Sequence, residues 1–245
     1  ILTNRYLLEN MLRFSVIGVK GGVGKSTIAY YLSSELSKSY KVLIVDRDYN
    51  STISRSFGLR NGLVNYVADG VKGDFMTERG NLRVLSLSNF QPSRIPTPSE
   101  ISKYYREALR DVDVVVTDNP PTFNDDICNL EMRAYWDILG EFNCSGIPVT
   151  TPGLSLQITL SSLNYFPEVV NRIVPNPYLT SPALVINMVR EDVKVEGWPE
   201  DKIVKIPFNK DILFKGFMNV PPPSEINRLV EKISFLLERK NSIKT

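Results

Sequence analysis

Short apolar runs recur along the chain, and most of them are continuous rather than alternating. Six of these runs, several rich in valine and isoleucine, cover Phe14–Ile17, Val42–Val45, Leu82–Leu87, Val112–Val116, Gly146–Val149 and Leu184–Val189. Continuous runs of this length are typical of parallel strands that are covered on both faces. The pattern therefore predicts the central strands of an α/β protein.

Stretches with helical periodicity lie between these runs and complete the expected fold. We expect helices over Thr27–Leu36, Ile101–Leu109 and Leu156–Tyr165. Strands that alternate with helices imply right-handed βαβ crossovers. We therefore predict one α/β domain over residues 11–245, a doubly wound, mostly parallel β-sheet with helices on both faces. We interpret residues 1–10, which precede the first run, as an N-terminal extension or an alternative start.

The last periodic segment predicts a helix over Glu225–Arg239, with Ser224 as its N-cap. Its apolar residues recur at i, i+3, i+4 and i+7 and form one face. Such a face suits packing on the sheet or binding to a membrane surface. Only a few polar residues follow the helix, so we favour packing on the sheet.

The amino-acid composition excludes several kinds of chemistry. The 245 residues include no histidine and two cysteines, Cys128 and Cys144. Without histidine there are no His-based triads or His-ligated metals, so proton transfer falls to carboxylates, lysines or water. The two cysteines are too few for a disulfide scaffold or a structural zinc site. Neither a membrane-spanning apolar run nor a signal peptide is evident, which indicates a soluble, cytoplasmic protein.

The formal net charge of +2 hides an uneven distribution. Residues 121–200 carry a net charge of −6, whereas residues 1–120 and residues 201–245 each carry +4. Ordinary solvated surface explains this pattern, and so does a basic face that binds an acidic partner.

A glycine-rich loop, Gly18–Thr27, gives the strongest chemical signal in the sequence. It follows the first predicted strand, opens the first predicted helix, and nearly matches GxxxxGK[ST], with Val19 where that pattern has its first glycine. Glycines let backbone N–H groups surround phosphate oxygens, and the helix N-terminus adds its dipole. We expect the phosphates of a nucleotide to be bound by Gly21, Gly22, Val23, Gly24, Lys25, Ser26 and Thr27.

Carboxylates follow two of the later strands. Asp46 and Asp48 end the second run, and Asp118 ends the fourth. Ligands of open α/β sheets bind at the carboxyl ends of the strands. Each aspartate alone could be a helix cap or a turn residue, but together with a phosphate loop they indicate a nucleotide site that uses Mg²⁺.

These motifs together resemble the ParA/MinD family of P-loop ATPases, which have a deviant Walker A motif, and most of all the ParA-like partition ATPases. Lys20, five positions before Lys25, is the extra lysine of that motif. Val-Asp46-Arg-Asp48 is similar to the family's second aspartate motif, and Thr-Asp118-Asn-Pro-Pro is similar to its Walker B motif.

Two later segments extend the resemblance over most of the chain. Leu-Val-Ile-Asn187 resembles the strand whose asparagine reads adenine, and Ile206-Pro207-Phe resembles the proline loop beside the base. Two departures stand out. Tyr49-Asn50 replaces the Pro-Gln that often follows the aspartate motif, and the segment after Pro121 is polar.

The resemblance implies a role for each catalytic candidate. Lys25 would bind phosphates in its own subunit, and Lys20 would reach the phosphates of a partner across a sandwich dimer. Asp48 would orient the attacking water. Such roles suit phosphoryl transfer, which depends on positioning and on charge stabilisation.

The resemblance also implies a metal site and a base site. Ser26 would ligate Mg²⁺, Asp46 would support its coordination shell, and Asp118 would hold a Mg²⁺-bound water. Asn187 and Pro207 would contact the base of ATP or ADP.

As a whole, the resemblance implies an ATP-gated homodimer that hydrolyses ATP slowly and positions or segregates plasmid or chromosomal DNA. The expected partners are DNA, bound without sequence preference, and a small DNA-binding activator protein, with the ATPase on the nucleoid or plasmid. Ordinary surface charge is an equally good explanation for each of the DNA-binding candidates, which are Lys202, Lys205, Lys210, Lys215, Arg228, Lys232, Arg239 and Lys240.

Three alternatives remain open. A MinD-like membrane ATPase needs a free amphipathic tail, and Asn241–Thr245 is too short to form one. Iron–sulfur carriers of the superfamily use paired cysteines, whereas Cys128 has no upstream companion, so we favour an incidental thiol. A scaffold with a dead site is disfavoured because every expected phosphate and Mg²⁺ residue is present.

Overall fold

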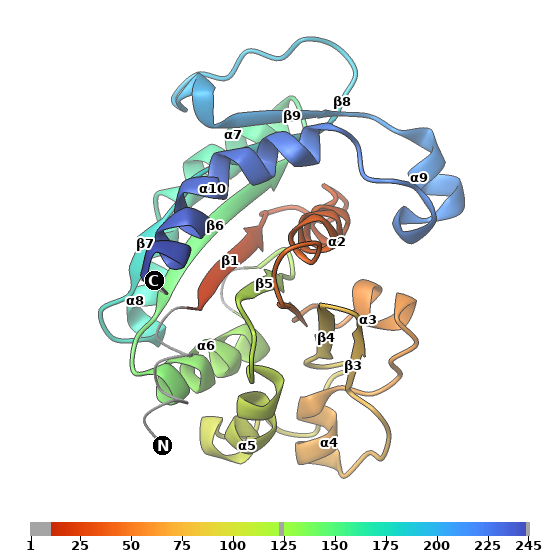
Figure 1. Ribbon diagram of the computed structural model, residues 1–245, viewed down its shortest axis with the longest axis vertical. Coiled ribbons are helices and arrows are strands. Elements are labelled where there is room, and N and C mark those ends of the chain that lie inside the picture. The colour runs from red at the N-terminus through yellow and green to blue at the C-terminus, as the bar shows by residue number, and fades with distance from the viewer. Residues whose placement is uncertain (1–10, 123–124, 244–245) are drawn as a thin grey trace.

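One nine-stranded β-sheet forms the centre of the computed structural model, which describes residues 11–122 and 125–243 (Figure 1). The proposed extension, residues 1–10, lies outside the described residues. The strands are β1 (Leu12–Ile17), β2 (Val42–Asp46), β3 (Met76–Arg79), β4 (Leu82–Ser86), β5 (Val114–Asp118), β6 (Asn143–Thr150), β7 (Tyr178–Thr180), β8 (Leu184–Val189) and β9 (Ile203–Pro207).

The strand order is β3-β4-β2-β5-β1-β6-β8-β9, and β7 pairs with the beginning of β6. Every pair is parallel except β3 with β4. This sheet confirms the predicted fold class, and all six apolar runs fall on its strands.

Helices connect the strands and cover both faces of the sheet (Figure 1). One face is covered mainly by α2 and α10, and the other by α4, α5, α6 and α8. The helices are α2 (Lys25–Leu36), α3 (Thr52–Ser56), α4 (Leu63–Asp69), α5 (Pro98–Ala108), α6 (Asp126–Leu139), α7 (Leu154–Leu163), α8 (Phe166–Ile173), α9 (Lys210–Lys215) and α10 (Glu225–Ile243).

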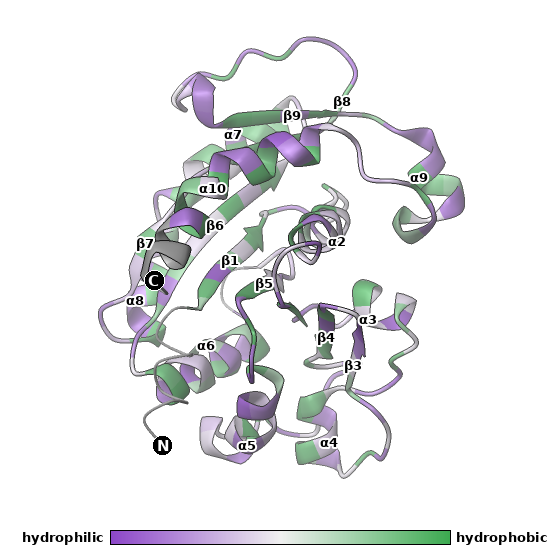
Figure 2. Ribbon diagram, in the orientation of Figure 1, coloured by the Kyte–Doolittle hydropathy of each residue, from purple (hydrophilic) through white to green (hydrophobic). Residues whose placement is uncertain are grey.

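Alternation along the strands divides their side chains between two cores. On β1, Phe14 and Val16 pack in the core beneath α2 and α10, whereas Arg13 points to α6, where it pairs with Glu131. Hydrophobic residues follow the central strands, and α10 alternates between hydrophobic and hydrophilic positions (Figure 2). Its apolar face is buried, as the sequence predicts.

Helix α6 is the longest element that the apolar pattern does not predict. Asp125 caps it by accepting hydrogen bonds from the N–H groups of Ile127 and Cys128 at 2.9 and 3.1 Å, and Gly140 ends it in the left-handed conformation. The polar segment after Pro121 is therefore in part a helix start. Across the described ranges, no helix combines the length and apolarity needed to cross a membrane.

Candidate functional site

The glycine-rich loop connects β1 to α2 at the carboxyl edge of the sheet. Gly24 precedes α2 with a φ of +93°, and a Cβ there would overlap the side-chain nitrogen of Asn187. Asn187 donates a hydrogen bond from that nitrogen to the carbonyl of Val23 at 2.9 Å. The loop is thus held by a residue of β8, and only glycine fits at its last position.

Gly24→Ala is expected to lower the free energy of unfolding by about 1–3 kcal/mol, the usual cost of a left-handed non-glycine residue. It should also weaken ATP binding, because the new methyl group displaces Asn187 from Val23. Denaturant unfolding and titration with a fluorescent ATP analogue measure the two effects. Gly21→Ala is the matched control for unfolding, because a Cβ at Gly21 has no neighbour within 4 Å. Equal unfolding of the two variants would contradict this account.

The two lysines of the loop lie in different surroundings. Lys25 is buried, and its ammonium donates a hydrogen bond to the carbonyl of Lys20 at 3.1 Å. Burial lowers the pKa of Lys25, although the charges of Asp118 and Asp48 oppose this effect. The side chain of Lys20 is partly exposed and forms no hydrogen bond or ion pair with any residue that the structure describes.

Asp46 and Asp118 occupy directly opposed positions at the ends of β2 and β5, and both are fully buried. Burial raises the pKa of Asp118, the nearby Asp46 raises it further, and the Ser26 hydroxyl and the Lys25 ammonium oppose both effects only in part. Burial also raises the pKa of Asp46. The buried environment therefore disfavours the charged form of both carboxylates.

Hydrogen bonds satisfy only a part of this carboxylate pair. Ser54 donates from its N–H and its hydroxyl to one oxygen of Asp46, at 2.8 Å each. The other Asp46 oxygen and both Asp118 oxygens accept no well-formed hydrogen bond from the described residues, although the Ser26 hydroxyl lies close to Asp118 and the backbone N–H of Asp48 lies close to Asp46. Unpaired buried carboxylates are costly, so this arrangement fits a cation.

The chemistry of these donors fits Mg²⁺ that arrives with a nucleotide. Mg²⁺ commonly takes one or two carboxylates and completes its octahedron with waters and substrate phosphates. Among residues 11–122 and 125–243, no three or more His, Cys, Asp or Glu side chains form a group that could hold a metal alone. Phosphate oxygens would therefore have to complete the site.

Asp48 is partly exposed and is held by the residue that departs from the family pattern. Its Oδ1 accepts hydrogen bonds from the backbone N–H and the side-chain amide of Asn50, at 3.0 and 3.1 Å. Tyr49 packs against the core beneath α6, and burial raises the pKa of its hydroxyl to about 12. Tyr49-Asn50 thus forms a turn that fixes Asp48 without a proline.

A shallow pocket lies beside the loop, between α2 and the ends of β8 and β9. Thr27, Asn187 and Pro207, three of the expected nucleotide residues, line it. A register shift between β8 and β9 occurs here, and Met188 has a φ of +61°. Bulges of this kind redirect side chains next to functional sites. A largely apolar pocket with a few polar groups can hold a planar base.

Sequence reasoning did not find several residues around the site. Further pocket residues include Tyr31 and Met188, and the Arg190 guanidinium stacks at 4.3 Å over the ring of Phe208, which belongs to the expected proline loop. They are separated in sequence, and only the fold gathers them. A second group, which includes Arg47 and Glu131, lies on the opposite face of the sheet. The one feature of the sequence that could have indicated this group is Glu131, a charged residue among the apolar residues of α6.

The basic residues near the C-terminal end of the chain are not equivalent. Ion pairs join Lys205 to Asp192 and Lys215 to Asp211 at 3.1 and 2.8 Å, and Lys232 donates to a backbone carbonyl. The side chains of Arg239 and Lys240 lie outside the described part. The basic candidates whose side chains form neither an ion pair nor a hydrogen bond with any described residue are Lys202, Lys210 and Arg228.

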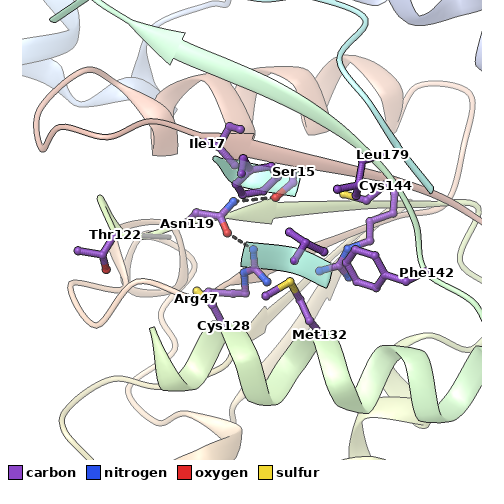
Figure 3. Close-up of a pocket in the computed structure, with 13 residues that line it drawn as sticks. Ser15, Ile17, Arg47, Asn119, Thr122, Cys128, Met132, Phe142, Cys144 and Leu179 are labelled. Atoms are coloured by element: carbon purple, nitrogen blue, oxygen red, sulfur yellow. Dashed lines mark hydrogen bonds between the residues drawn. The ribbon is translucent and has the colours of Figure 1, made fainter. Parts of the chain in front are cut away.

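Both cysteines are buried and line one cavity of about 440 Å³ on the α6 side of the sheet (Figure 3). Burial raises the pKa of Cys128 to about 12 and also raises the pKa of Cys144. Metals bind the thiolate form of cysteine. Neither thiol is therefore placed or ionised to bind a metal cluster at the protein surface.

A protein-family model matches most of the chain. The model of the CobQ/CobB/MinD/ParA nucleotide binding domain matches residues 14–213, which include every expected nucleotide and metal residue.

Two solved structures share the fold over most of the chain. A putative plasmid partition protein from Borrelia burgdorferi, bound to AMPPNP, has a TM-score of 0.63 at 17% identity and covers 94% of this chain and 99% of its own. The septum site-determining protein MinD from Pyrococcus horikoshii, complexed with Mg-ADP, has a TM-score of 0.62 at 20% identity and covers 94% and 98%.

Curated relatives match a smaller part of the chain. The iron-sulfur cluster carrier protein of Pyrococcus furiosus is 29% identical over 160 residues, which are 57% of this chain and 51% of that protein. The cytosolic Fe-S cluster assembly factor Nubp2 homolog of Aedes aegypti is 30% identical over 149 residues, 56% of each chain. The chain spans about half the length of these relatives.

Proposed function

This chain belongs to the CobQ/CobB/MinD/ParA nucleotide-binding domain family, and on that premise we propose that it is a Mg²⁺-dependent ATPase that forms an ATP-gated dimer and positions or segregates DNA. One observation carries the nucleotide part of this proposal. The glycine-rich loop, with Lys25, adjoins two buried carboxylates, and of their oxygens only the one that Ser54 bonds has a well-formed hydrogen bond from the described residues. Family membership confirms the resemblance on which the ATPase expectation rests.

In this proposal the chain's own groups position the phosphates of ATP. Lys25 and the backbone N–H groups of the loop bind the phosphates, and Asp48 orients the attacking water. Ser26, Asp46 and Asp118 hold Mg²⁺, which neutralises charge on the phosphate oxygens when bound. Asn50 keeps Asp48 in place through the hydrogen bonds described above.

The position and surroundings of Lys20 support the proposed dimer. Its side chain has no partner among the described residues, and it stands at a loop position that an ordinary phosphate loop leaves free. A lysine supplied across a dimer interface would stabilise charge on the neighbour's phosphates, as an arginine finger does. Hydrolysis of ATP would then weaken the contact between Lys20 and the neighbour's phosphates, and the dimer would dissociate.

The DNA role is the finer part of the proposal. It is supported by the similar fold of a protein named for plasmid partition and by the unpaired cations Lys202, Lys210 and Arg228. We place the ATP-loaded dimer on nucleoid or plasmid DNA and expect a small DNA-binding protein to stimulate hydrolysis.

Two rival functions have specific support and specific obstacles. The names of the curated relatives favour an iron–sulfur carrier, whereas Cys128 and Cys144 are both buried. The fold of a septum site-determining protein favours a membrane-positioning role, whereas the apolar face of α10 packs on α2 and the sheet. Neither the thiols nor this helix face is available at the surface.

ATP-loaded protein is expected to bind long duplex DNA without sequence preference, with an affinity that falls steeply as salt rises. Replacing Lys202, Lys210 and Arg228 by alanine together should reduce the slope of log affinity against log salt by about 1–3, because each lost phosphate contact removes about 0.9. Gel shifts over a salt series measure the slope.

A matched control replaces Lys205 and Lys215, which are held in ion pairs, and it should change the slope less. If ATP-loaded wild-type protein fails to shift DNA at low salt, the segregation role is wrong. A coloured, cluster-bearing protein after anaerobic purification would favour the carrier role instead.

A further inference from the structure

Four buried polar side chains join the ends of three central strands to helix α6, and we refer to them as the strand-end brace. They are Arg13 on β1, Arg47 after β2, Asn119 after β5 and Glu131 on α6. Three of them line the cavity shown in Figure 3, where dashed lines join Arg47 to Asn119 and Asn119 to Ser15. None of the four belongs to the proposed nucleotide site.

Glu131 is the α6 end of the strand-end brace. Its two oxygens accept hydrogen bonds from Arg13 at 2.8 and 2.6 Å, and one of them accepts a third from Arg47 at 2.8 Å. The Tyr105 hydroxyl donates another. Burial alone would raise the pKa of Glu131, but the two guanidinium groups lower it to about 2. The carboxylate is therefore charged and fully bonded.

Arg47 and Asn119 are the strand ends of the brace. Arg47 donates to the side-chain oxygen of Asn119, whose amide donates to the carbonyl of Val16 at 2.7 Å. The backbone N–H of Arg47 donates to the carbonyl of Asp118 at 3.0 Å. The brace thus links the segment that carries Asp46 and Asp48 to the Asp118 segment and to the strand that leads into the glycine-rich loop.

Alternation along the strands keeps the brace away from the nucleotide side. Successive side chains of a strand point to opposite faces of the sheet. Asp46 bonds to α3 on one face, whereas the next residue, Arg47, bonds to α6 on the other. The brace can therefore fix the backbone of the site without touching a bound nucleotide.

We infer that the strand-end brace is a positioning device for the phosphoryl transfer proposed above, on which this inference rests. A buried group of two arginines and one glutamate adds little net stability, because desolvation offsets the attraction between the charges. An apolar core could not supply the directed hydrogen bonds with which these side chains hold the strands in place. It ties Arg47, between two of the site aspartates, to the end of β5 and, through Asn119, to β1. A misplacement of about 1 Å at such a site can cost about a hundredfold in rate.

The test replaces the three charged members together, as Arg13→Met, Arg47→Met and Glu131→Leu, so that no unpaired charge stays buried. The variant is expected to unfold at about the wild-type denaturant concentration and to bind ATP with an unchanged Kd. Its kcat should fall about 10–100-fold, as expected of a positioning loss. Arg133→Met, which removes an exposed guanidinium from the same helix, is the control and should keep kcat within about twofold.

A second variant covers the case in which the triple replacement does not fold. Arg47→Lys keeps the charge but replaces the planar fork, whose two nitrogens bond Glu131 and Asn119 separately, with a single flexible nitrogen, so kcat should fall about tenfold at an unchanged KM. If a folded variant of either kind hydrolyses ATP at the wild-type kcat, the positioning role is wrong. A wild-type chain that binds ATP without hydrolysing it would instead contradict the proposed function.

Discussion

Lys25→Ala is expected to abolish measurable ATP hydrolysis and to weaken ATP binding. The ammonium of Lys25 is buried beside Asp118, and it is the loop cation that we propose binds phosphates within its own subunit. Removal of one preorganised charge-stabilising donor typically costs about 10²–10³-fold in kcat. Phosphate release and titration with a fluorescent ATP analogue measure the two effects.

Lys38→Ala is the matched control for the Lys25 variant, because Lys38 is exposed and its ion-pair partner among the described residues is Glu35, on the surface of the molecule. It should hydrolyse ATP like the wild type. A Lys25→Ala protein that retains more than about a tenth of wild-type turnover would show that the loop is not the phosphate site.

Lys20→Ala is expected to separate ATP binding from dimerisation and hydrolysis. If Lys20 meets the partner's phosphates across a water-poor interface, its charge is weakly screened there. The variant should bind ATP almost as the wild type does and remain a monomer. Hydrolysis should fall about 10³-fold, in line with the loss of a cation supplied in trans. Light scattering and phosphate release with ATP and Mg²⁺ measure these changes.

Asp48→Ala is the companion variant, because it removes the group proposed to orient water and leaves the phosphate contacts intact. It should form the ATP dimer without cleaving ATP. A Lys20→Ala protein that dimerises and hydrolyses like the wild type would place the chain among ordinary phosphate-loop proteins and end the dimer mechanism.

The fold could be predicted where strands are buried on both faces, because such strands appear in the sequence as continuous apolar runs. Val42–Val45 and Val114–Val116 are continuous apolar runs because helices cover both sides of β2 and β5. Strand β3 has no such apolar run, since it is a short, largely exposed edge strand. Helix α6 was not predicted, because without knowledge of how the helix packs, its N-cap Asp125 looks like part of a polar loop.

The candidate site could be predicted in part, because its residues follow strands and a recognisable loop. The register that sets Asp46 opposite Asp118 follows from two parallel strands that end together. The contact of Asn187 with Val23 could not be predicted, since it depends on a bulge in β8. The ion pairs of Glu131 with Arg13 and Arg47 were also hidden, because nothing local in the sequence joins such distant residues.

The position of β1 in the sheet has a consequence for how the chain folds. Its neighbours are β5 and β6, so Leu12 pairs with Val114 and Phe14 pairs with Ser145. Pairings this distant in sequence form slowly, because loop closure must come before the contacts that reward it. During synthesis the strand that leads into the loop waits unpaired until β5 has emerged. The glycine-rich loop therefore takes its place beside the neighbouring strands late in folding.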